Sequence, residues 1–132
     1  MVELAAKCAG EPIENTSAAS ASPRSVAIDR AHLARMTHGE RDLEREVLQL
    51  YAAQANLLLG RMLARPVPPA AVAALAHTLN GSSRGIGAWD VAEAAAGLEA
   101  DAAAGREIAA SIERLAAAIR VAQAAVAELV RD

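Results

Sequence analysis

The chain has 132 residues, the size of one domain, and 54% of them are hydrophobic, which is enough to bury a core. Only 2% are aromatic and alanine is abundant, a composition that favours helices over sheets. The formal net charge of −3, with arginines scattered among acidic residues, leaves no basic face for nucleic acid, so DNA and RNA are not expected as partners.

The cysteine content and the hydropathy of the chain indicate its compartment. Cys8 is the only cysteine, so neither a disulfide nor a cysteine-based metal site can form within one chain, which suits a reducing cytoplasm. The first 25 residues lack the apolar core of a signal peptide, and no later stretch has the ~20 uninterrupted apolar residues that span a bilayer. We expect a cytoplasmic protein with no membrane partner.

Residues 1–26 are rich in Ala, Ser, Pro and Thr, and beyond a short VELAAK opening they show no sustained helical periodicity. We predict a flexible N-terminal arm over residues 1–26 and a helical domain over residues 27–132. The composition leaves two other interpretations of the arm open, a linker remnant and a short helix that docks on the helical domain.

From Asp29 the pattern becomes helical. Asp29 can cap a short helix that carries Leu33 and Met36 and ends near Gly39. A long amphipathic helix is predicted next, over residues 42–63. Its stripe recurs mostly three and four residues apart: Leu43, Val47, Leu50, Gln54, Leu57, Leu58 and Met62. The following RPVPP sequence ends this helix, because proline lacks an N–H donor and restrains the preceding residue.

Two further helices are separated by glycines. The third is predicted from about Pro69 and should loosen at Gly85 and Gly87. The fourth covers residues 88–104 and stops at Gly105. Its small apolar stripe consists of Ala88, Val91, Ala95, Leu98 and Ala102.

The fifth helix is predicted from Glu107 to near Val130. One continuous stripe runs along it: Ile108, Ile112, Leu115, Ile119, Ala122, Val126 and Leu129. Four long helices joined by short links predict an all-α fold, an up-and-down antiparallel four-helix bundle with a short additional N-terminal helix. We expect a monomer.

His77 lies in the third helix, on the side away from its apolar residues. At 100° per residue these cluster in one direction: Val72, Leu75, Leu79 and Ile86. His77 lies nearly opposite and should face water. Small or polar residues surround it on the outer face: Ala70, Ala73, Ala74, Asn80, Gly81 and Arg84. Gly81 costs roughly 1 kcal/mol of helix propensity against Ala and clears space beside the imidazole. Ser82 and Ser83 should point toward the core, where a hydroxyl can bond to a backbone carbonyl one turn earlier; we favour the other interpretation, that they are small packing residues between close helices.

These residues carry a resemblance to a known family. The sequence HTLNGSS at 77–83, followed by IGA at 86–88 and LE at 98–99, resembles the signature of the histidine-containing phosphotransfer (HPt) domain. That signature is usually written H-x-L-K-G-S-S or S-A, with G-A a few residues later. The resemblance covers about residues 29–130, and it includes the helix order and the outward-facing histidine.

The resemblance implies a phosphoryl carrier of a bacterial two-component phosphorelay, with His77 as phosphoacceptor. The partners would be receiver domains of response regulators, with a histidine kinase or hybrid kinase upstream. The receiver would supply Mg²⁺, so the chain needs no cofactor of its own. A neutral imidazole is a nucleophile near pH 7, and phosphoryl transfer depends chiefly on positioning and charge neutralisation. The partner surface would comprise Ala73, Ala74, Asn80, Gly81 and Arg84.

The sequence departs from the family at Asn80, where lysine is usual. Asn offers hydrogen-bond donors but no charge for the incoming phosphoryl group. Arg84, one turn further and almost in line with His77, either supplies that charge or is a solvated surface arginine.

No other motif indicates chemistry. His32 and His38 stand six residues apart without zinc-binding spacing, and we interpret them as surface or capping residues, so no metal site is expected. The chain has no nucleotide-binding motif and no Ser-His-Asp or Cys-His set, which excludes an autonomous kinase. Two alternatives to phosphotransfer remain open: an adaptor that docks receiver or kinase domains without transfer, and a dimerisation module that uses the stripe of the fifth helix.

Overall fold

The computed structural model describes residues 26–64 and 67–131, so the predicted arm, apart from Val26, lies outside the described residues. The described part contains five helices and no strand, which confirms the all-α prediction. The helices are α1 (Arg30–Met36), α2 (Arg41–Leu63), α3 (Pro69–Ile86), α4 (Trp89–Ala103) and α5 (Ala109–Arg131).

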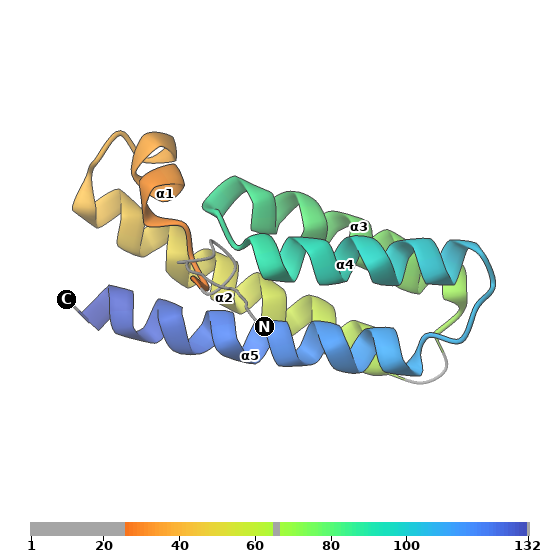
Figure 1. Ribbon diagram of the computed structural model, residues 1–132. Helices are drawn as coiled ribbons and strands as arrows, with labels where there is room; N and C mark the ends of the chain where they lie inside the picture. The colour runs from red at the N-terminus through yellow and green to blue at the C-terminus, as the bar shows by residue number, and fades with distance from the viewer. Residues whose placement is uncertain (1–25, 65–66, 132) are drawn as a thin grey trace, which may run out of the picture.

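The four long helices pack as neighbours in a closed order. Helix α2 contacts α3 and α5, and α4 contacts α3 and α5, while α1 lies against α3. Successive long helices run in opposite directions along the molecule (Figure 1). The apolar faces of the helices therefore meet in one core, which includes Leu48, Leu79, Leu98 and Leu115.

Helix α1 begins as its sequence predicts. The Asp29 side chain accepts a hydrogen bond from the His32 backbone N–H at 3.1 Å, which caps the helix. Leu33 is fully buried, whereas Met36 is exposed. After the helix the chain turns through His38 and Gly39, both in the left-handed region with φ of 55° and 73°.

The predicted stripe of α2 is wrong in part. Leu50 and Leu57 are 65% and 55% exposed. The buried side of the helix consists instead of Glu44, Leu48, Tyr51, Ala55, Leu58 and Met62. Three consecutive leucines at 57–59 make the apolar spacing compatible with more than one register. Packing selects the register that buries Tyr51, whose hydroxyl lies 2.7 Å from Ser83 Oγ on α3.

Helix α3 begins at Pro69 as predicted, and the bounds of α4 and α5 differ from the predicted ones by one or two residues. Helix α3 continues through Gly85 and ends at Gly87, which has φ of 83°. A Cβ at Gly87 would lie 2.9 Å from both the Cβ and the carbonyl oxygen of Asp29, so this position requires glycine. Only Gly87 ends the helix, because Gly85 keeps helical backbone geometry.

The predicted stripe of α5 faces the core of the same chain. Leu115, Ile119, Ala122 and Val126 are buried, and the remaining residues of the stripe, Ile108, Ile112 and Leu129, are partly buried against the core. The apolar side of α5, which a dimerisation module would use, is therefore largely buried within one chain. No helix within residues 26–64 and 67–131 is both long enough and apolar enough to cross a bilayer.

Candidate functional site

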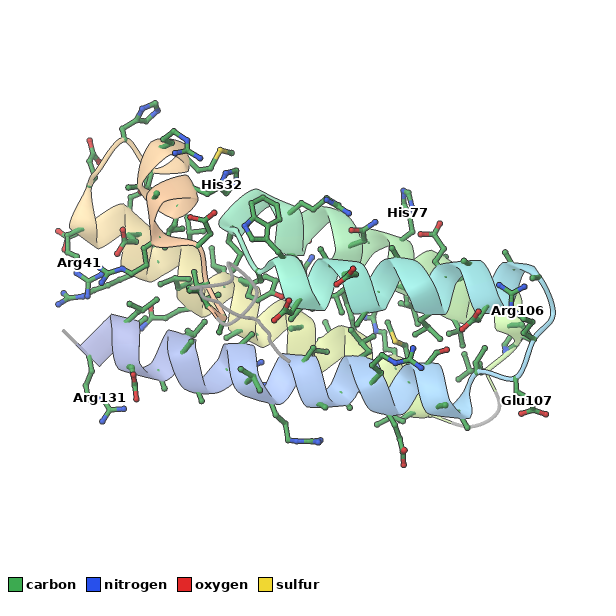
Figure 2. The ribbon with its side chains drawn as sticks, in the orientation of Figure 1. His32, Arg41, His77, Arg106, Glu107 and Arg131 are labelled. Atoms are coloured by element: carbon green, nitrogen blue, oxygen red, sulfur yellow. The ribbon has the colours of Figure 1, made fainter. Side chains whose placement is uncertain are left out.

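His77 projects from the outer side of α3. Its side chain keeps 74% of its surface exposed, and Figure 2 shows the ring pointing away from the helices. The residues on the opposite side of α3 are buried: Val72, Ala76, Leu79, Ser83 and Ile86. The helical periodicity therefore predicts the direction of His77, because the apolar side of α3 must face the core.

One ring nitrogen of His77 has a partner on the next helix. Nδ1 lies 3.0 Å from Oε2 of Glu99 on α4, and the Glu99 side chain is about one-third exposed. A carboxylate can only accept, so in the neutral ring the proton is on Nδ1. Nε2 then carries the free lone pair.

The contact with Glu99 was not predicted, although the sequence contains a signal for it. His77 and Glu99 are each eleven residues from Ala88, which follows the glycine that ends α3. Two antiparallel helices joined by so short a turn bring residues equidistant from the turn side by side. Glu99, the second residue of the LE pair at 98–99, therefore lies beside His77.

The residues beside His77 have short side chains or none, which leaves the surface around the imidazole open. Gly81 is exposed, and a Cβ built at this position would have no heavy atom within 4 Å. Ala74 is exposed and Ala73 is half-buried. Packing does not require glycine at position 81, so its effect is to keep side-chain bulk away from the next turn of the helix.

Asn80 and Arg84 are joined to each other. Arg84 Nε donates a hydrogen bond to Asn80 Oδ1 at 2.9 Å, across one helical turn. In the described part of the chain no carboxylate forms an ion pair with Arg84. The guanidinium charge is therefore held on the outer side of α3 without a neutralising partner there.

The two serines of the motif have different surroundings. Ser83 is fully buried and is bonded to the Tyr51 hydroxyl rather than to a backbone carbonyl, while Ser82 is half-buried. Burial raises the pKa of Tyr51, and the hydrogen bond with Ser83 opposes that shift. Ser83 thus couples α3 to α2 beneath the exposed surface.

His32 lies outside this site, at the α1 end of the molecule (Figure 2), and His38 lies in the turn between α1 and α2. His38 is exposed. His32, which we interpreted as a surface or capping residue, is half-buried: its ring lies against Trp89, with the ring centroids 4.9 Å apart, and its backbone N–H donates to the capping Asp29 side chain. Docking of α1 beside the α3–α4 turn covers it. Among the described residues no three His, Cys, Asp or Glu side chains form a group that could hold a metal ion.

Comparison of the chain with protein-family models, curated proteins and solved structures yields no match. The resemblance to the HPt signature therefore rests on the motif residues, the helix order and the outward-facing histidine. The chemistry of the site has to follow from the geometry around His77.

Proposed function

We propose that this protein is a phosphoryl carrier in a two-component phosphorelay, accepting a phosphoryl group on His77 and exchanging it with aspartates of receiver domains. The observation that supports this most is the exposed imidazole of His77, with Nδ1 paired to Glu99 and Nε2 open to solvent. An enzyme would need a pocket around its reacting group, whereas a carrier must present that group to another protein's active site.

The transfer step follows from this arrangement. The Nε2 lone pair forms a bond with the phosphorus of an aspartyl phosphate, and the bond from phosphorus to the carboxylate oxygen breaks. The electron pair of that bond leaves with the aspartate, and the phosphoryl group remains on Nε2. The ring then carries positive charge and keeps the proton on Nδ1, where the Glu99 carboxylate stabilises it.

The neighbouring residues complete the role of the surface. Gly81 and Ala74 leave room for a receiver domain to approach, and Arg84, held by Asn80, places a positive charge one turn beyond the usual lysine position. The positive charge of Arg84 would stabilise the negatively charged phosphoryl group during transfer. The receiver would contribute Mg²⁺, and the chain would use no cofactor or ATP site of its own.

We infer the finer architecture and the setting on the same basis. The closed order of contacts and the alternating helix directions support an up-and-down antiparallel four-helix bundle, with α1 as the additional N-terminal helix. The buried stripe of α5 supports a monomer. The expected setting is the cytoplasm, with receiver domains and a histidine or hybrid kinase as partners.

Chemical phosphorylation tests the acceptor without knowledge of the natural partner. The full chain is incubated with phosphoramidate, and incorporated phosphate is measured by mass spectrometry before and after acid treatment. We expect one acid-labile phosphoryl group on the natural protein and none on His77→Gln. The matched control is His38→Asn, because His38 is also exposed and asparagine tolerates its positive φ.

His77→Gln should keep the helical circular dichroism of the natural protein, since an exposed side chain leaves no cavity when it is changed. Acid-labile phosphate on folded His77→Gln would exclude His77 as the acceptor. If the natural protein takes up no phosphate from phosphoramidate or from a panel of phosphorylated receivers, yet binds a receiver, the adaptor function replaces the proposal.

A further inference from the structure

The outer side of α2 that adjoins α3 carries two exposed leucines. Leu50 and Leu57 each leave more than half of their surface exposed, and their spacing of two helical turns places them on one side of α2. The flank of α2 that faces α5 is marked by Ala52 and Asn56, whose oxygens accept hydrogen bonds from Gln123. At about 100° per residue, the leucines lie on the other flank of the buried side, toward α3.

The contact between Tyr51 and Ser83 fixes which parts of α2 and α3 lie side by side. Their hydroxyl oxygens are 2.7 Å apart, and the two helices run in opposite directions (Figure 1). Leu57 follows Tyr51 by as many residues as His77 precedes Ser83, so Leu57 and His77 are level along the bundle. Leu50 lies about 10 Å further along α2. Both leucines are therefore beside the turns of α3 that carry the candidate site.

Short side chains separate His77 from the two leucines. His77 lies on the α4 side of α3, where it meets Glu99, whereas the leucines lie next to the α2 side. Ala74 and Gly81 lie on the outer side of α3 between them, and both are exposed. A protein that rests on this side of α3 therefore reaches the imidazole on one flank and the leucines on the other.

The same face carries little charge. No Asp, Glu, Lys or Arg occurs in residues 47–60 of α2, and Arg84 is the only one in α3. Charged residues are depleted at the centres of protein interfaces, which are more apolar than the rest of the surface. Helix α4, by contrast, carries several acidic residues: Asp90, Glu93, Glu99 and Asp101.

The demands of phosphoryl transfer determine which protein covers this face. A donor or acceptor domain has to bring an aspartate to Nε2 of His77, on a standard interface of roughly 800 Å² per partner, which extends about 16 Å from its centre. Packed helices lie about 8–10 Å apart, so this interface includes a neighbour of α3. A partner that carries aspartates and phosphate is repelled by the acidic residues of α4, whereas the uncharged face of α2 accepts it.

We propose that the receiver domain docks across α3 onto α2, with Leu50 and Leu57 as its apolar contacts and the outer side of α3 beneath it. This inference rests on the proposed function, because it assigns the surface that binds the partner of His77. It adds residues of α2, which the motif does not contain. It also gives a role to Gly81, since the missing side chain lets the partner approach α3 closely enough to touch both flanks.

Two phosphoryl sources separate docking from the chemistry of the acceptor. The natural full-length chain and two double variants are phosphorylated with phosphoramidate, which is too small to need a docking surface, and are then mixed with each receiver domain encoded in the same genome. Leu50→Ser with Leu57→Ser changes the proposed contacts. Leu63→Ser with Val121→Ser is the matched control, because both residues are also more than half exposed but lie away from this face. Circular dichroism checks each fold, and the loss of phosphohistidine gives the transfer rate.

We expect the Leu50→Ser, Leu57→Ser variant to take up phosphate from phosphoramidate as the natural protein does, but to pass it to the fastest receiver at least tenfold more slowly. The control variant should match the natural protein in both steps. Equal transfer rates for the two double variants would overturn the docking surface and leave the proposed function standing. Loss of phosphoramidate uptake in the leucine variant would also overturn it, because the leucines would then act on His77 itself. If the natural protein passes phosphate to no receiver, the docking surface and the proposed function both fail.

Discussion

At His77 one of the two ring nitrogens is already engaged, since Nδ1 lies 3.0 Å from Glu99 Oε2. Removal of this carboxylate by Glu99→Ala should slow phosphorylation by phosphoramidate about fivefold, because a partly exposed charge contributes roughly 1 kcal/mol. The ¹⁵N chemical shifts of the ring should also change, as the proton is no longer held on Nδ1. The free energy of unfolding should change by less than about 0.5 kcal/mol.

Glu128→Ala is the control for this effect, because Glu128 is an exposed glutamate on α5. It should leave both the rate and the ring shifts as in the natural protein. If Glu99→Ala also leaves both unchanged, Glu99 does not position His77.

Asn80 and Arg84 form the second residue-scale feature, a hydrogen-bonded pair in place of the usual lysine. Arg84→Ala should slow transfer from a phosphorylated receiver about fivefold, and Asn80→Lys should speed it by a similar factor. Once Lys is present, loss of Arg84 should matter less, so the double-mutant cycle should be non-additive.

Arg120→Ala removes an exposed arginine from α5 and is the control for the loss of one positive charge elsewhere on the surface. It should leave the rate of transfer unaltered. Additive effects in the cycle, or a full rate for Arg84→Ala, would remove Arg84 from the partner surface.

At the scale of one element, α2 offers a direct test of its register. Leu58 is 6% exposed and its neighbour Leu57 is 55% exposed. Leu58→Ala should lower the free energy of unfolding by about 2 to 5 kcal/mol, because it leaves a cavity in the core. Leu57→Ala should change it by less than about 1 kcal/mol. Urea unfolding of both variants measures the difference, and a loss for Leu57→Ala as large as that for Leu58→Ala would contradict the register of α2 in the structure.

At the scale of the whole molecule, Asp29 joins α1 to the turn between α3 and α4. Its backbone N–H donates to the Gly87 carbonyl at 2.9 Å, and its carboxylate accepts from Trp89 Nε1 at 3.0 Å. The indole hydrogen bond, followed by the bond from the His32 backbone, holds the pKa of Asp29 below its usual 3.8. The attachment of α1 to the turn between α3 and α4 is therefore strongest when the Asp29 carboxylate is ionised.

This dependence predicts a loss of stability in acid. The pKa of Asp29 is lower in the folded chain, so the unfolded chain binds the proton more readily and the contribution of Asp29 is lost as pH falls below about 4. Asp29→Asn should flatten this decline, as measured by urea unfolding followed through the fluorescence of Trp89, the only tryptophan. Asp42→Asn, at an exposed position on α2, should retain it. A decline as steep in Asp29→Asn as in the natural protein would contradict this role.

Much of the local structure was predictable from the sequence. The cap at Asp29, the proline-rich end of α2 and the buried stripe of α5 were all predicted, as was the outward direction of His77. A cap or a proline acts on the backbone within one turn, and a continuous apolar stripe admits only one core-facing side. The residues that determine these features are close together in the sequence.

The tertiary structure decided what those signals left open. The leucines at 57–59 allow more than one register for α2, and packing against the other helices selects the one that buries Tyr51 beside Ser83 of α3. The partnership of His77 with Glu99 requires α3 and α4 to pack in opposite directions about Gly87. Apolar spacing determines which residues can be buried, whereas contacts between helices distant in sequence determine which side chains meet.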